Sequence, residues 1–185
     1  MKSIKSLVLL AILREYFAFS GLPGRRSSFN LLKDSSRDIS ILEDASISRN
    51  IDKDSVCNLI LNYENCSKSN QAKIEDLKGK WELIFSSLIP KGYFPVTEVC
   101  DFFEYSLSSS WKNIPIGYIT GESNIISRSP AVIEFTPIQV KIGPFTIKFS
   151  SKKTKSYTFL YIGKSIALAR SSNSNGLTLM RKIQE

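Results

Sequence analysis

Hydrophobic residues alternate with polar ones along much of the carboxyl-terminal half of the chain. The alternating segments are residues 132–135, 138–142, 145–149, 157–161, 166–170 and 177–181. A period of two is typical of β-strands that bury one face. Gly143-Pro144 and the run 173–176, which ends in Asn-Gly, predict tight turns between strands.

Residues 77–87 predict a further strand that opens the sheet. Trp81, Leu83 and Phe85 alternate there on one face, and Gly79 allows a close approach of the backbone. About seven or eight short strands joined by hairpins favour a mostly β fold, an antiparallel up-and-down barrel of the lipocalin-like kind.

One end of this barrel is predicted to be plugged by Trp81. Two arginines near the carboxyl terminus, Arg170 and Arg181, are candidates to cover its ring. A guanidinium can stack on an indole while it donates hydrogen bonds to backbone carbonyls. This pairing is expected to close the floor.

The region before the barrel is polar and has a helical pattern. Apolar residues recur there at spacings of three and four between residues 38 and 70. They predict one or two helices against the mouth of the barrel, with Asp54 or Ser55 as a cap, followed by a Ser/Asn-rich loop over 65–71.

Residues 1–37 have the properties of a leader, and 38–185 are taken as the barrel domain. An apolar core over 7–13 follows Lys2 and Lys5 and is too short to span a bilayer. An acid-free segment rich in Ser and Arg comes next. We expect the mature protein to begin at or beyond Phe19; the alternative is an amphipathic helix that stays in the mature protein.

The amino-acid composition limits the kinds of site and partner that the protein can have. The 185 residues are 42% hydrophobic and 23% charged, as expected for one globular domain, and they include no histidine, which excludes His-based triads and zinc sites. Seven basic and three acidic residues among the first 38 account for half of the formal charge of +8. A nucleic-acid partner is therefore not expected.

The three cysteines show no metal-binding spacing. Cys57, Cys66 and Cys100 are odd in number and form no Cys-x-x-Cys pair. Ordinary thiols are favoured over a redox switch, and a Cys57–Cys66 or Cys66–Cys100 bridge is left open.

Two motifs carry a family resemblance. The opening strand has the pattern Leu-x-Gly-x-Trp-x-Leu, followed four residues later by Ser. The closing strands contain a second motif, whose residues have the same spacing as in the family. The matching residues are Leu77, Gly79, Trp81, Leu83 and Ser87, then Tyr161, Arg170, Gly176, Leu179 and Arg181. Over about residues 38–182 the chain resembles the plastid lipid-associated proteins, the fibrillin or plastoglobulin family. It departs from them at Gly163 and Ala167, where the family has Asp and Arg.

The resemblance implies a plastid protein at thylakoids or plastoglobules that binds or organises a hydrophobic small molecule without converting it. A carotenoid, a quinone, a tocopherol or an acyl chain would suit an apolar barrel interior. The predicted ligand-binding residues are Trp81, Phe135, Val140, Ile147, Phe149, Phe159, Tyr161 and Arg170. No cofactor or metal is expected. The same apolar residues also suit a filled barrel without a cavity.

Other features leave alternatives open. The basic run Lys148, Lys152, Lys153 and Lys155 suits either anionic lipid head groups or a solvated hairpin tip. Residues 111–118 predict a lid or a loop packed on the barrel end. The carboxylates are expected to face water. Two rival functions remain: an enzyme that acts on a pigment, such as a bilin-lyase-like barrel, and a non-binding accessory subunit of a photosynthetic membrane complex.

Overall fold

The computed structural model describes residues 35–66, 72–149 and 154–184. The predicted leader and its cleavage site therefore lie outside the described residues, apart from positions 35–37. The predicted 65–71 loop lies outside them beyond Cys66, as do Lys152 and Lys153.

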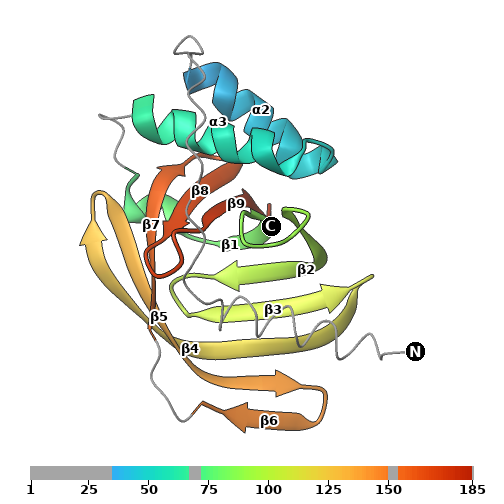
Figure 1. Ribbon diagram of the computed structural model, residues 1–185. Helices are drawn as coiled ribbons and strands as arrows, with labels where there is room; N and C mark the ends of the chain where they lie inside the picture. The colour runs from blue at the N-terminus through green and yellow to red at the C-terminus, as the bar shows by residue number, and fades with distance from the viewer. Residues whose placement is uncertain (1–34, 67–71, 150–153, 185) are drawn as a thin grey trace.

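The described residues form one antiparallel sheet of nine strands (Figure 1). The strands are β1 (Lys80–Ser86), β2 (Tyr93–Asp101), β3 (Ser106–Trp111), β4 (Ile114–Arg128), β5 (Ala131–Ile142), β6 (Phe145–Lys148), β7 (Lys155–Ile162), β8 (Ile166–Ser171) and β9 (Leu177–Lys182). Pairing of β9 with β1 and of β4 with β5 closes all but β6 into a barrel of eight strands. The predicted lipocalin-like barrel with amino-terminal helices is confirmed.

β6 lies outside the barrel wall. It pairs with β5 over residues 139–142, whereas β7 pairs with β5 over residues 132–135. The far end of β5 thus leaves the wall together with β6 and the start of β4. We call residues 114–119 and 138–148 the flap. Figure 1 shows β6 at the edge of the molecule farthest from the helices.

The turns around the flap are short. Gly143, with a φ of 57°, lies between β5 and β6, as the Gly-Pro pair predicted. Residues 111–118, predicted to be a lid or a loop, instead form the β3–β4 hairpin. Lys112 and Asn113, with φ of 49° and 65°, make its two-residue turn. The prediction failed because this turn needs two positive φ angles and contains no glycine to signal them.

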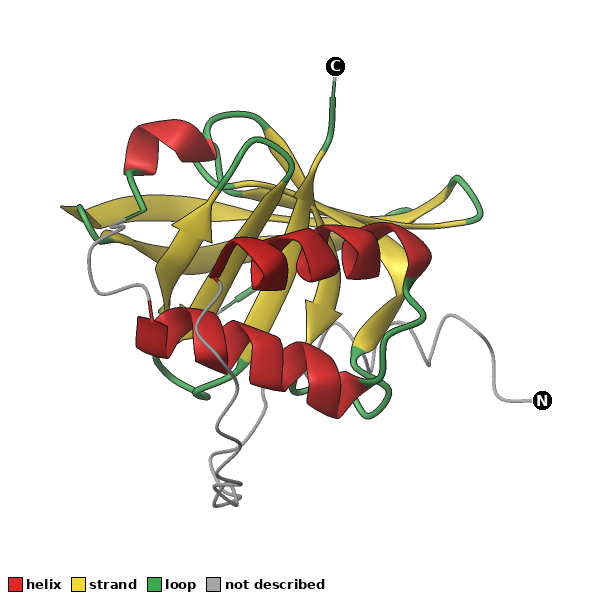
Figure 2. Ribbon diagram, turned by 90° about the horizontal axis from the view of Figure 1, so that it is seen from above, coloured by secondary structure: helices red, strands yellow, loops and turns green. Residues whose placement is uncertain are grey.

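Two helices, α2 (Ser35–Ser48) and α3 (Lys53–Cys66), lie across the outer face of the barrel wall (Figure 2). Their apolar side chains pack on outward-facing residues of β1, β8 and β9. The expectation that they cover the mouth was wrong. The cap also differs: Asp52 accepts a hydrogen bond of 2.9 Å from the Ser55 backbone N–H, because α3 begins at Lys53, before both predicted caps.

The wall is consequently apolar on both faces. Along β8, Ile166 and Leu168 point outward to the helices, whereas Ala167 and Ala169 point into the barrel. The same division holds on β9 for Leu179 and its neighbour Met180. The barrel therefore has an inner core and an outer core on opposite sides of one wall.

Two β-bulges invert the alternation that the sequence predicted. The register shifts between Leu83 and Phe85, so Phe85 joins the outer core rather than the face of Trp81. A second shift between Phe159 and Tyr161 turns Tyr161 outward, where its ring meets that of Tyr63 on α3 at 5.4 Å. An inserted residue moves every later side chain to the other face.

Candidate functional site

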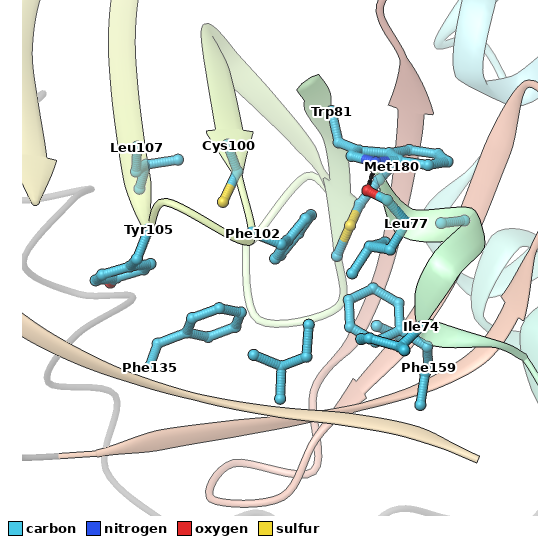
Figure 3. Packing of buried hydrophobic residues seen from close by; sticks show 14 of the residues in the cluster. Ile74, Leu77, Trp81, Cys100, Phe102, Tyr105, Leu107, Phe135, Phe159 and Met180 are labelled. Atoms are coloured by element: carbon cyan, nitrogen blue, oxygen red, sulfur yellow. Dashed lines mark hydrogen bonds between the residues drawn. The ribbon is translucent and has the colours of Figure 1, made fainter. Parts of the chain in front are cut away.

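The barrel is closed at one end by Trp81, as predicted, but not in the predicted way. Trp81 is fully buried, and its indole N–H donates a hydrogen bond of 2.8 Å to the backbone oxygen of Leu77 (Figure 3). Leu77 ends the short helix η1 (Ile74–Leu77), which fills the bottom of the barrel with Ile74. The cation over the indole ring is Lys182, with its ammonium 5.2 Å from the ring centre.

Neither arginine stacks on Trp81, because strand alternation directs both outward. Arg181 pairs with Glu82 in the β1–β9 register, whereas its neighbour Lys182 pairs with Trp81. Arg170 lies under α3, where it binds the carboxylate of Glu64 with two of its nitrogens. Arginine stacking at the floor is therefore ruled out, and a lysine takes that position.

Glu82 forms a buried ionic cluster on the outer face. Its two carboxylate oxygens accept hydrogen bonds from Arg49 at 2.7 Å and from Arg181 at 2.6 Å. The residue is only 7% exposed. The expectation that strand carboxylates face water was wrong here because the helices cover this part of the wall.

The interior of the barrel contains a cavity of about 60 Å³ that is partly open to solvent, and Cys100, the partner of Trp81 across β1 and β2, is among its lining residues. Phe94, Lys155 and Thr178 lie near the starts of β2, β7 and β9, at what we call the open end. The cavity is lined by Leu83, Phe94, Glu98, Cys100, Phe102, Tyr105, Leu107, Phe135, Lys155, Tyr157, Thr178 and Met180. Most of these side chains are apolar, so the cavity offers contact to hydrocarbon.

Four of the residues that line the cavity are aromatic rings in mutual contact, and Figure 3 shows those of Phe102, Tyr105 and Phe135. Phe135 stacks on Tyr105 with ring centres 4.9 Å apart, and it also meets Phe102 at 5.6 Å and Tyr157 at 5.7 Å. The position of Tyr105 depends on Gly121 of β4, because a Cβ atom there would lie 2.6 Å from the Tyr105 ring. These rings are held by contacts between three strands and a turn.

The polar residues of the interior gather near the cavity. Glu98 is 3% exposed, Ser109 is 3% exposed and Thr178 is 7% exposed. Glu98 pairs with Ser109 across β2 and β3, so both side chains point inward at the same level. Glu98 was predicted to face water, but Phe94, Val96, Glu98 and Cys100 alternate on the buried face of β2. That alternation in the sequence indicated that Glu98 faces inward.

The cysteines are all free thiols. Cys100 lines the cavity, and its burial, together with the carboxylates of Asp101 and Glu98, raises the pKa of its thiol well above the usual range. Burial also raises the pKa of Cys57. The open question of a disulfide is thus answered against both bridges.

The predicted ligand-binding residues are distributed over three places. Trp81, Phe135, Val140 and Phe159 belong to the inner core, and Phe149 packs against it. Ile147 lies on the flap and is 53% exposed. Tyr161 and Arg170 were predicted to face inward but lie on the outer face, as does Leu168. Among the eight predicted ligand-binding residues, Phe135 lines the cavity and the other seven do not.

Within the described residues, no helix is long and apolar enough to cross a membrane. Comparisons with protein-family models, with curated proteins and with solved structures found no match.

Proposed function

We propose that this barrel binds one hydrophobic small molecule end-on and does not convert it. The observation that carries the proposal is the partly open cavity, with its apolar lining and the buried carboxylate of Glu98. Sites for small molecules are typically apolar hollows with a few polar groups that orient the ligand. Removal of apolar surface from water would supply the affinity, at about 25 cal/mol per Å².

The size of the cavity determines how such a ligand lies. Pockets that enclose a drug-sized molecule measure about 300–1,000 Å³, whereas this cavity measures about 60 Å³. The inner core fills the rest of the barrel. One end of the ligand therefore enters the cavity, and the remainder lies outside the barrel.

The flap provides an apolar surface for that remainder. Val140 pairs with Ile147, and Ile142 pairs with Phe145, so these four side chains share the face that continues the barrel interior. Val140 is buried, but Ile147 is 53% and Phe145 is 72% exposed. Exposed apolar surface of this kind often marks a binding site.

Isoprenoids and acyl lipids have the required shape, with one end distinct from a long apolar chain. A carotenoid, a quinone, a tocopherol or an acyl lipid of plastid thylakoids or plastoglobules is the ligand class we propose, in line with the resemblance to fibrillins. An enzyme acting on an open-chain tetrapyrrole is less favoured, because the described residues that line the cavity include no arginine to bind its two propionates.

The same end of the molecule suits a membrane surface. Trp111, Ile114 and Phe145 are exposed at the two turns of the flap region, and Phe145 is the most exposed of the large apolar residues described there. Lys112, Lys141 and Lys148 lie among them and are also exposed. Apolar side chains with interspersed lysines favour contact with an anionic lipid surface. We propose this surface as the partner from which the ligand is taken.

Native mass spectrometry of the full chain mixed with a plastid lipid extract tests the binding proposal. Wild type should retain a bound lipid or isoprenoid. Leu107→Trp fills the cavity with an indole and should lose the ligand while the circular dichroism spectrum stays unchanged. Leu61→Trp, the same change at a leucine exposed on α3, is the matched control. Unchanged ligand retention by folded Leu107→Trp would overturn the proposal.

A further inference from the structure

We propose that two copies of this chain pair through the free edges of their β6 strands, so that the two flaps form one antiparallel sheet across a two-fold axis. The inference goes beyond ligand binding and does not depend on it. It follows from the backbone of β6, from the order of its side chains and from its place in the molecule.

The first observation is the unpaired edge of β6. Within residues 35–66, 72–149 and 154–184, β6 pairs only with β5 and stands at the end of the strand order. All four of its residues are exposed. Figure 1 shows β6 as the outermost strand on the side away from the helices. Such an edge is a template for another strand, because one row of its N–H and C=O groups is not used by the sheet.

The register identifies which backbone groups lie on this edge. The Phe149 N–H donates a hydrogen bond of 2.8 Å to a backbone oxygen of β5. Because bonded and non-bonded positions alternate in antiparallel pairs, Phe145 and Ile147 also direct their backbone groups toward β5. Thr146 and Lys148 therefore direct their N–H and C=O groups away from β5, where a second strand can bind them.

The side chains of β6 are complementary to an antiparallel copy of the same strand. With Ile147 on the two-fold axis, Thr146 lies opposite the partner's Lys148, and the two residues exchange both backbone hydrogen bonds. The lysines are then staggered, so neither faces another lysine. A register centred on Lys148 would place two ammonium groups opposite each other. One centred on Thr146 would pair with Pro144, which has no N–H to donate.

This register also joins the apolar faces of the two flaps. Ile147, which lies beside Val140 of its own β5, meets the partner's Ile147 across the axis. Phe145 and Ile147 are 72% and 53% exposed in the single chain, so pairing removes apolar surface from water. The two-fold axis is perpendicular to the sheet, and both copies therefore present this face to the same side. A dimer of this shape suits the lipid surface proposed above as a partner.

The small interface implies a reversible dimer. Only four residues of each β6 strand pair, whereas stable interfaces involve about 20–30 residues a side. Covalent trapping is therefore the appropriate measurement.

Disulfide trapping in the full-length chain tests the register, with Cys66→Ala as the background because Cys66 is an exposed thiol. Across a non-hydrogen-bonded antiparallel pair the Cα atoms lie about 4.5 Å apart, a distance that a disulfide can bridge. Ile147→Cys should thus form a disulfide-linked dimer in oxidised glutathione. Thr146→Cys places its two thiols on a diagonal, with about 7–8 Å between the residues, and should not. Ile126→Cys on β4, also 53% exposed, is the matched control for random collision.

A further variant separates strand pairing from simple contact between apolar faces. Thr146→Pro removes an N–H from the free edge but no hydrogen bond to β5. Added to Ile147→Cys, it should slow dimer formation by about tenfold, because the two thiols lose the effective concentration that pairing gives them. Circular dichroism checks the fold of each variant. If Thr146→Pro does not fold, the comparison of the three cysteine variants still decides.

Four results would overturn the proposal. Ile147→Cys could dimerise no faster than Ile126→Cys, or more slowly than Thr146→Cys. The addition of Thr146→Pro could leave the rate unchanged, which would show contact between the flaps without strand pairing. Finally, the thiol of Ile147→Cys could resist both oxidation and alkylation by iodoacetamide, which would show that another segment of the same chain covers β6. Ligand retention is measured separately, so failure of the dimer leaves the proposed function standing.

Discussion

The ammonium group of Lys182 lies 5.2 Å from the centre of the Trp81 ring at the closed end of the barrel. Both residues belong to paired strands and face each other in the β1–β9 register. Lys182 is partly exposed, whereas Trp81 is completely buried. The indole therefore provides the packing that closes the barrel, and the lysine covers its outer side.

Trp81→Ala should lower the free energy of unfolding by about 3–5 kcal/mol, because it empties the floor of the inner core. Lys182→Ala should cost at most ~1 kcal/mol, as for a cation–π contact that is partly exposed. Chemical denaturation measures both. Equal losses in the two variants would show that the cation, not the buried indole, holds this end closed.

Glu82→Ala should destabilise the protein by ~1–3 kcal/mol, because it removes the carboxylate shared by Arg49 and Arg181. The side chains of Arg49 and Arg181 are 32% and 37% exposed, so their charges can still reach water, which limits the loss. Glu75→Ala breaks the exposed pair with Arg128 and should leave the denaturation midpoint unchanged. The same small effect in both variants would contradict a structural role for the Glu82 cluster.

Phe159→Asp should prevent folding, because Phe159 is 1% exposed and packs edge-on against Phe102 at 5.4 Å. Phe145→Asp, at a flap position that is 72% exposed, should fold normally. Circular dichroism and a thermal melt compare the two variants. A folded Phe159→Asp protein with a wild-type midpoint would mean that this part of the interior is hydrated rather than filled.

Replacing both Phe145 and Ile147 by Ser should weaken binding to vesicles that contain anionic lipid, because apolar contact area is lost at the flap. Lys141→Gln with Lys148→Gln should also weaken it and should reduce its dependence on salt. Co-sedimentation with vesicles measures the bound fraction. Phe103→Ser, an exposed aromatic in the β2–β3 turn at the other end of the barrel, is the control. If all these variants bind as wild type does, the flap is not the membrane-facing surface.

The buried thiol of Cys100 predicts a dependence of stability on alkaline pH. Burial raises its pKa in the folded protein above the ordinary value of 9.0, so the unfolded chain loses the proton first. Stability from this group is complete below pH 9.0 and falls above it, by ~1.4 kcal/mol per pH unit. The difference in unfolding free energy between wild type and Cys100→Ala should therefore narrow as pH rises. Cys66→Ala, the same change at an exposed position, is the matched control for the substitution itself.

Local patterns in the sequence predicted most of the elements. The alternation over residues 132–135, 166–170 and 177–181 corresponds to strands β5, β8 and β9. The turn at 173–176 lies between β8 and β9, with Asn175 at a φ of 55°. The helical spacing before residue 70 corresponds to α2 and α3. Each of these features depends on residues close together in the chain, so the sequence alone determines it.

Tertiary structure decided which face of each strand is inside. Alternation shows that Ile166, Leu168 and Arg170 share a face, but not that the helices cover it. Because α2 and α3 bury the outside of the wall, apolar residues occur on both of its faces. The difference between an apolar inner face and a polar, water-exposed outer face is therefore lost from the sequence. Single-residue bulges then turned Phe85 and Tyr161 outward.

The residues of the cavity also divide into features that the sequence determines and features that only the tertiary structure decides. The alternation that ends at Cys100 contained the signal for an inward Glu98, but the general rule that carboxylates face water outweighed it. Only closure of the barrel by the β9–β1 and β4–β5 pairs brings Glu98 and Thr178 into one space with Phe135. The residue types of the site were thus determined by the sequence. Their convergence was decided by pairings between strands that lie far apart along the chain.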